Sequence, residues 1–524
     1  MEALLEIVGL MAVVVAVYAA SRRFHLLTPI ALVVVGLALS MVPGIPTFHL
    51  SPEFVLIGVL PPLLYVAALE TSVPAFKFNL RPILLLSVGL VLFVACSIGL
   101  LVHALLPGVP LAICFALGAV VAPPDAIAAT AVARRIGLPR RIVTILEGES
   151  LLNDATALVF FRVATAAAIG EAAGLGEIGL QVVRSAGGGV LIGAAGALIM
   201  GFLHKKTTDP LIDNSLSLLT PFLVTAAAEA LHASAVVAVV VAGLYLGHRL
   251  PTLMSAASRL QMGAFWRMVQ FLLEGSVFLL VGLQLRDVLG ALDTPLGEVA
   301  VITTAVVLAV VITRFVWMFP ATYLPRMIPR VGRNDPPPPW QVPTVIAWAG
   351  MRGVVTLATA LALPATPLVG GGDYPRALFV WLAFAVIIAT LLLQGMTLPL
   401  VARRLRLQPD DPMQDILAEA ATQNAASRAA IERLEQHAAG APAEVVERLR
   451  RLTTERNNTA WERLGGGEET PSQAYVRLRF EMLDAEREVY RTARDSGRIP
   501  EEVLVRAQRD MDLEESMLER SEHA

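Results

Sequence analysis

The sequence predicts an all-α polytopic membrane protein with about 13 transmembrane helices and a helical extension. The chain is 56% hydrophobic and its mean hydropathy is +0.66, whereas soluble domains are about 45–50% apolar. In addition, long apolar runs recur from the N-terminus to residue 402. The runs long enough to cross about 30 Å of hydrocarbon are 3–20, 27–42, 52–69, 82–106, 109–133, 142–169, 178–203, 214–231, 233–248, 264–285, 297–322, 343–363 and 376–402.

Basic residues gather at alternate connections between these runs. Arg22 and Arg23 follow the first run, and the alternation continues to Arg403, Arg404 and Arg406. Because cytoplasmic loops carry an excess of Lys and Arg, we expect a multi-pass protein of the cell membrane with its N-terminus outside. The first run is acidic at its start and is followed by bases, the reverse of a secretory signal peptide, and is therefore expected to be a membrane span.

Composition changes near residue 404. Residues 1–404 contain 24 basic and 19 acidic side chains, whereas residues 405–524 contain 17 arginines and 25 acidic side chains. We therefore predict a transmembrane domain over 1–404 and a cytoplasmic helical domain, expected to be regulatory, over 405–524. Helical periodicity in the second part predicts four helices, at 416–436, 443–464, 471–496 and 500–520. A charged tail that only solvates the protein is the alternative.

One polar patch lies inside an apolar run, between residues 147 and 161. It contains Glu149, Ser150, Asn153 and Asp154 within a few residues. A charged side chain at bilayer depth costs about 2.5–3.5 kcal/mol on insertion scales, and such groups are usually functional. Helical spacing places Ser150 and Asp154 on one face. This oxygen-rich face suits a small cation or a proton, although a hydrogen-bonded structural carboxylate is the alternative.

Two runs contain helix-breaking sequences at mid-depth. The fifth has two prolines before Asp125, and the twelfth has Arg352 between Gly350 and Gly353. Proline removes a backbone donor and disfavours helix before it. Since seven spans separate the breaks, they run antiparallel, which is typical of inverted repeats around a midplane ion site. Asp125 and Arg352 are placed to neutralise the exposed helix ends, while simple capping is the alternative for Asp125.

Buried charges in these runs require partners. We expect Glu149 to pair with Arg352, because neither could remain charged alone at that depth, and this leaves Asp154 as the unpaired carboxylate. Glu274 and Arg314 lie in neighbouring runs, and a structural pair is expected there. Glu70, at the end of its run, is expected to have an interfacial role.

Other classes of function have little support in the sequence. The two cysteines lie in apolar runs, and the chain has no HExxH or CxxC spacing. Metal catalysis is therefore not predicted. We expect no enzyme activity, no cofactor and no nucleic acid partner.

Several stretches carry a family resemblance. They are Gly148–Phe160 (GESLLNDATALVF), the break at Ala122–Ile127, the LPPLL sequence at Leu60–Leu64, and Gly350–Gly353 followed by an apolar run. In these stretches the chain resembles the monovalent cation/proton antiporters, in the branch that contains the NhaP-type and NHE-type sodium/proton exchangers. The resemblance covers essentially all of residues 1–404. It implies an inverted-repeat antiporter fold, a symmetric homodimer, and an elevator-like movement of the core that carries the ion.

The resemblance also implies roles for individual residues. Asp154 matches the aspartate that binds ion and proton, Asn153 its neighbour in an Asn-Asp pair, and Ser150 a supporting ligand. Asp125 matches the acid of the helix break. The transported monovalent cation is therefore expected at Asp154 and Asp125.

Glu149 and Arg352 match the structural ion pair of the same family. The sequence departs from the family at two places. Pro124 and Ala126 stand where a threonine and a proline often flank the acid of the break, and Val66 stands where the related pattern has an acid. These departures leave the choice between Na⁺/Li⁺ and K⁺ open.

The function expected from the sequence is exchange of Na⁺, or Li⁺ or K⁺, for H⁺ by alternating access, with Asp154 as the shared site. One titrating acid beside an amide favours electroneutral exchange. The expected partners are the monovalent cation, H⁺, membrane lipid and a second copy of the chain. The alternatives are a K⁺/H⁺ antiporter, and a membrane ion or pH sensor that uses the same buried acids.

Overall fold

The computed structural model describes residues 2–24, 26–43, 51–170, 175–365, 374–407, 409–462, 470–496 and 498–523. Every regular element in these residues is a helix, as the fold class predicts. The chain divides into two compact units, Met1–Pro409 and Asp410–Ala524. The division falls five residues beyond the predicted boundary.

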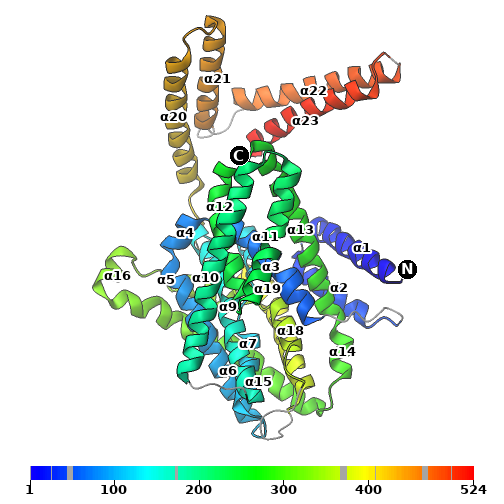
Figure 1. Cartoon of the computed structure of the whole chain (residues 1–524), viewed down its shortest axis with the longest axis vertical. Coiled ribbons are helices and arrows are strands. Elements are labelled where there is room, and N and C mark those ends of the chain that lie inside the picture. The colour runs from blue at the N-terminus through cyan, green and yellow to red at the C-terminus, as the bar shows by residue number, and fades with distance from the viewer. Residues whose placement is uncertain are drawn as a thin grey trace. The chain divides into compact units, whose positions relative to one another are not determined.

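The first unit contains nineteen α-helices (Figure 1). They are α1 (Glu2–Arg23), α2 (Thr28–Ser40), α3 (Leu60–Glu70), α4 (Val73–Phe78), α5 (Leu80–Leu84), α6 (Val91–Leu105), α7 (Leu111–Val121), α8 (Ala126–Arg135), α9 (Arg140–Ile169), α10 (Leu175–Lys206), α11 (Pro210–Ala230), α12 (Ala235–Leu253), α13 (Ala256–Leu283), α14 (Leu285–Gly290), α15 (Leu296–Tyr323), α16 (Pro329–Asn334), α17 (Gln341–Trp348), α18 (Val354–Leu361) and α19 (Arg376–Arg404). Short π-helical turns at Phe54–Val59 and Leu85–Leu90 precede α3 and α6.

Nine stretches of the described residues are long and apolar enough to cross a membrane as helices, judged by length and composition. Shorter apolar helices occupy 28–40, 54–70 and 111–121. The structure interrupts the fifth and twelfth predicted runs, since α7 and α8 flank residues 122–125 and α17 and α18 flank residues 349–353. The predicted runs at 214–231 and 233–248 are separate helices, α11 and α12.

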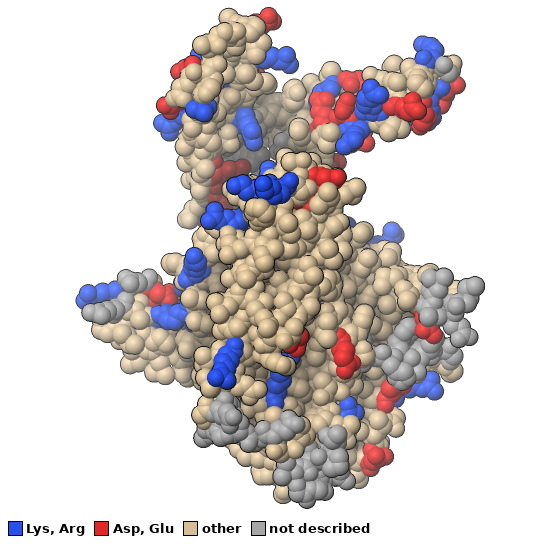
Figure 2. Space-filling model, in the orientation of Figure 1, with Lys and Arg blue, Asp and Glu red and all other residues tan. Residues whose placement is uncertain are grey.

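The outer surface of the first unit is largely apolar. Large side chains such as Leu191, Val301 and Ile312 are more than half exposed, and Figure 2 shows broad areas without charge over this part of the chain. A water-soluble protein would not present so much contiguous apolar surface. These side chains therefore face lipid, consistent with the multi-pass membrane protein that the composition predicts.

Helix α9, which carries the polar patch, lies inside the unit. It packs against α3, α6, α7, α8, α12 and α17, among others. Gly170 ends the helix in the left-handed region, with φ of 89°, and its N–H bonds the carbonyl of Ala166. Glycine adopts this conformation without steric cost. The central position of α9 surrounds its polar side chains with protein rather than lipid.

The second unit contains two helical hairpins. Helix α20 (Pro412–His437) packs on α21 (Ala443–Glu462), and α22 (Pro471–Asp495) packs on α23 (Glu501–His523), at the positions that periodicity predicts (Figure 1). The second hairpin buries a small apolar core of Val476, Leu483, Met511 and Leu518. Arg479 joins its helices through two bonds to Glu514, of 2.6 and 2.8 Å.

A cluster of arginines surrounds Asp335 in the connection between α16 and α17. Arg81, Arg141 and Arg326 all form ion pairs with its carboxylate, at 2.8 Å for Arg141 and 2.7 Å for Arg326. Burial raises the pKa of Asp335, but the hydrogen bond from Arg141 and the positive charges of the three arginines outweigh this and hold the pKa below its ordinary value.

This cluster predicts an acid-dependent stability difference. Because the pKa of Asp335 is lowered in the folded protein, the carboxylate stabilises the fold above its unfolded pKa of about 3.9. That contribution is lost as pH falls through the lower folded value. Thermal unfolding of Asp335→Asn should therefore occur at lower temperature than wild type at pH 7, and the gap should close as pH falls below about 4. A gap of constant size would contradict the assignment.

Candidate ion-binding site

The two helix breaks meet in the interior of the first unit. The backbone N–H of Asp125 donates to the carbonyl of Met351 at 2.7 Å, and the guanidinium of Arg352 donates to the carbonyl of Ala122. The N–H of Arg352 donates to the hydroxyl of Thr390 on α19, at 3.0 Å. Backbone groups that the breaks release from helical bonding are thus satisfied by the opposite break or by α19, as a buried position requires.

The charged side chains of the breaks lie at helix ends of opposite polarity. Asp125 directly precedes α8, and its carboxylate lies so close to Gly353 that a β-carbon there would fall 1.8 Å from Oδ2. Gly353 is the N-cap of α18, so the carboxylate lies between two positive helix ends. Arg352, fully buried, bonds a carbonyl at the negative end of α7. This arrangement agrees with the neutralising roles predicted for both residues.

The contact at Gly353 predicts the effect of one added methyl group. Gly353→Ala should displace the Asp125 carboxylate, because the backbone fixes the position of the added β-carbon and that position overlaps the carboxylate. We expect lower folded yield and loss of transport in reconstituted protein. Gly187→Ala is the matched control, since a β-carbon there meets nothing within 4 Å. Equal transport by wild type and Gly353→Ala would show that this approach is not required.

Asn153 connects α9 to the first break. Its side-chain N–H donates to the carbonyl of Pro124 at 2.6 Å, and the residue is fully buried. Its Oδ1 atom has no hydrogen-bond partner among the described residues. The sequence leaves open what replaces the missing threonine hydroxyl in this wall. In the structure, Pro124 lines the adjacent cavity and its carbonyl is held by Asn153.

A cavity of about 270 Å³ opens beside these groups. Its walls come from α3, α8, α9, α13 and the two breaks, and they include Ser150 and five carboxylate side chains, namely Glu70, Asp125, Glu147, Asp154 and Glu274. Asp154 is only 7% exposed. Of the predicted site residues, the structure therefore brings Asp125, Ser150 and Asp154 to one cavity. Glu149, Asn153 and Arg352 are not among the residues that line it.

The predicted pairing of Glu149 with Arg352 is wrong. Glu149 instead accepts two bonds from Arg314 on α15, at 2.6 and 2.9 Å, and both residues are 1% exposed. Arg314 also donates to the carbonyl of Ile346 at 3.2 Å. The Arg314 side chain has room there because Gly350 has no side chain. A β-carbon on Gly350 would lie 2.5 Å from the Arg314 side chain. The guanidinium of Arg352 instead donates to the carbonyl of Ala122 at the end of α7.

The expected pair of Glu274 and Arg314 is also wrong, because Arg314 pairs with Glu149. Glu274 accepts a bond of 2.6 Å from Gln270, one turn earlier on α13, and lines the cavity. Glu70 also lines the cavity rather than only the surface. A lone base at the centre of the apolar run 297–322 was the sequence signal for Arg314, but residue spacing does not identify which buried acid it meets.

A family model and several known proteins are similar to this chain. The model for the family described as sodium/hydrogen exchanger, transmembrane, matches residues 9–404. An uncharacterized Na⁺/H⁺ exchanger of Mycobacterium tuberculosis is 36% identical, over 98% of this chain and 96% of that protein. The Na⁺/H⁺ antiporter ApNhaP of Aphanothece halophytica is 32% identical, over 81% of this chain and 77% of that protein.

Among solved structures, the fold resembles the sodium proton antiporter MjNhaP1 from Methanocaldococcus jannaschii. The TM-score is 0.60 at 18% identity, covering 77% of this chain and 99% of that chain. This likeness supports the fold, and the match to the family model supports the predicted cation/proton exchange. The chain belongs to the sodium/hydrogen exchanger family.

Proposed function

We propose that the chain exchanges Na⁺ or another monovalent cation for H⁺, with Asp154 as the site that both species share. The observation that carries this proposal is the cavity at the helix breaks, which combines the buried Asp154 with Ser150 and Asp125 in the interior of the first unit. Carboxylate, hydroxyl and carbonyl oxygens are the ligands that hard cations prefer. A proton and a cation would compete for the same oxygens of Asp154.

The surrounding charges support electroneutral exchange. Glu149 and Arg314 cancel each other, Asp125 lies at two positive helix ends, and Arg352 lies at a negative one. Of the other acids in the cavity wall, Glu147 is paired with Arg134 and Glu274 accepts a bond from Gln270. We assign the change of charge during the cycle to Asp154. Because the empty charged site is costly to move through a low-dielectric environment, the core moves when Asp154 carries either a proton or a cation, one for one.

The route to the site opens toward the connection between α8 and α9. The cavity extends from Asp154 to Glu147 and Arg134, which pair at 2.7 Å, and Arg134 is exposed. Basic residues there assign this connection to the cytoplasm. We therefore assign the structure to an inward-facing state of an alternating-access cycle, in which the core moves like an elevator.

The membrane arrangement follows from the same pattern. The nine long helices, the three shorter apolar helices and the broken pair α17–α18 support thirteen crossings, with the N-terminus outside and the second unit, which we expect to be regulatory, in the cytoplasm. The antiparallel breaks support inverted repeats. The family assignment supports a symmetric homodimer.

The choice of cation rests on relatives. ApNhaP is named a Na⁺/H⁺ antiporter. However, a Bacillus pumilus relative, 32% identical over 73% of this chain and 59% of its own length, is named a sodium, potassium, lithium and rubidium/H⁺ antiporter. K⁺/H⁺ exchange is therefore the second candidate. Because the sequence departures at Pro124 and Val66 leave the choice between Na⁺/Li⁺ and K⁺ open, the three cations are compared in one assay.

Proteoliposomes test this function. Purified protein is reconstituted with an imposed pH gradient, and Na⁺, Li⁺ or K⁺ is then added. For Na⁺ and Li⁺, valinomycin with equal K⁺ on both sides holds the membrane potential at zero. For K⁺, the permeant cation tetraphenylphosphonium at equal concentration on both sides does so. Antiport predicts cation-dependent dissipation of the gradient without any potential. Dissipation that requires a potential indicates a channel, and no dissipation with any cation indicates a sensor.

A further inference from the structure

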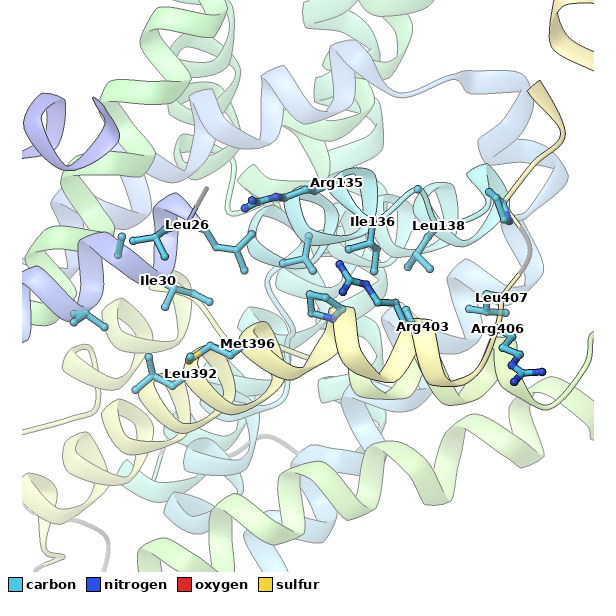
Figure 3. Close-up of a pocket in the computed structure, with 18 residues that line it drawn as sticks. Leu26, Ile30, Arg135, Ile136, Leu138, Leu392, Met396, Arg403, Arg406 and Leu407 are labelled. Carbon is cyan, nitrogen blue, oxygen red and sulfur yellow. The ribbon is translucent and has the colours of Figure 1, made fainter. Parts of the chain in front are cut away.

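A second cavity, of about 840 Å³, lies apart from the exchange site. Helices α2, α8 and α19 form its walls. Figure 3 shows Arg403 extending from α19 across the cavity toward α8, where Arg135 lies on the opposite wall, whereas Arg406 points away. None of its lining residues lines the cavity at Asp154. Exchange at Asp154 therefore gives this larger space no role.

The charged residues that line this cavity are all basic. Its eighteen lining residues include Arg135, Arg403 and Arg406 and no acidic residue. All three arginines are exposed. Guanidinium groups on facing walls are suited to bidentate recognition of a phosphate group. The part of the cavity between Arg135 and Arg403 therefore favours an anion.

The rest of the lining is apolar. Leu26 and Ile30, at the start of α2, face Leu392 and Met396 of α19 (Figure 3). Val34 of α2 also lines the cavity and is 45% exposed. A free phosphate or a nucleotide would leave this apolar surface without a partner. A ligand with a phosphate at one end and hydrocarbon at the other satisfies both parts.

We propose that this cavity binds an anionic phospholipid of the cytoplasmic leaflet, with its phosphate between Arg135 and Arg403 and an acyl chain along α2 and α19. In the orientation proposed above, the three arginines lie at the cytoplasmic surface, where anionic lipids concentrate and attract basic side chains. The site is a cleft within one chain and requires no second copy.

The location connects the bound lipid to the exchange core. Helix α8 begins directly after Asp125, and α19 contains Thr390, which holds the backbone of Arg352. A lipid between α2 and these two helices contacts one helix that begins at the first break and another that bonds the second break. We therefore expect anionic lipid to alter the rate of exchange as well as to bind.

Native mass spectrometry of the full-length protein in neutral detergent tests the proposal. Phosphatidylglycerol is titrated, with phosphatidylcholine and inorganic phosphate as separate arms. Removing two arginines, in Arg135→Gln/Arg403→Gln, should weaken phosphatidylglycerol binding on the order of tenfold. The control Arg249→Gln/Arg404→Gln removes two exposed arginines outside the cavity and should bind as wild type does.

A second pair of measurements keeps the test decisive if the double variant folds poorly. Arg403→Gln alone should weaken binding severalfold, and Val34→Trp should block the acyl chain while leaving all three arginines in place. Equal phosphatidylglycerol binding by wild type and the cavity variants overturns the proposal. It is also overturned if phosphatidylcholine binds equally well, or if inorganic phosphate displaces the lipid at equal concentration, since the site would then recognise only an apolar chain or a free anion. These outcomes do not depend on whether exchange occurs.

Discussion

Asp154→Asn should reduce cation-dependent proton movement in proteoliposomes to the level of protein-free vesicles. The amide keeps the shape of the side chain but can neither bind a proton at neutral pH nor present a negative charge to a cation. Because Asp154 is nearly buried, replacing its carboxylate by an amide removes a desolvation cost. The variant should therefore fold in normal yield and unfold at the same temperature as wild type, or higher.

The control for this variant is Glu229→Gln. It makes the same chemical change at an exposed acid of α11, which pairs with Arg162 and does not line the cavity at Asp154. We expect it to exchange as wild type does. Exchange by purified, folded Asp154→Asn at a rate near that of the control would reject Asp154 as the carrier.

Arg314→Met should greatly reduce the yield of folded protein. It leaves Glu149 charged and unpaired in a site that is 1% exposed, and breaking a buried ion pair in this way costs about 3–5 kcal/mol. Total stabilities are about 5–15 kcal/mol, so the loss is a large fraction of the whole. Thermal unfolding and the monodisperse fraction after purification measure the effect.

Two further variants test whether the pairing itself is responsible. Glu149→Leu/Arg314→Met removes both charges and should recover most of the lost stability, because well-packed apolar replacements of buried pairs are often neutral. Arg162→Met breaks an exposed pair, Arg162–Glu229, and should cost only about 0–1 kcal/mol. If Arg314→Met and Arg162→Met destabilise equally, the buried pair has no structural role.

The sequence predicted the features that depend on local pattern. Apolar run length located the helices, and proline and glycine located both breaks, because these residues determine backbone conformation by themselves. The oxygen-rich face of α9 was also readable, since Ser150 and Asp154 are one helical turn apart. For the same reason the four helices of residues 410–523 lie at their predicted positions.

The features that the sequence did not predict depend on packing between distant elements. Glu149 and Arg314 are 165 positions apart, and two buried arginines, Arg314 and Arg352, both satisfied the rule that buried charges pair. Only the crossing of α9, α15 and the second break decides that Arg314 reaches Glu149 while Arg352 reaches Ala122. The roles of Glu70 and Glu274 in the cavity wall also depend on how α3 and α13 pack.

The most direct test of the central claim is the dependence of cation affinity on pH in proteoliposomes with the membrane potential held at zero. If one carboxylate binds either a proton or a cation, protons compete with the cation. The KM for the cation should then rise by up to tenfold for each unit that pH falls, while the maximal rate at saturating cation stays constant. A KM independent of pH, with exchange still dependent on both ions, would mean that proton and cation occupy separate sites and would contradict the account.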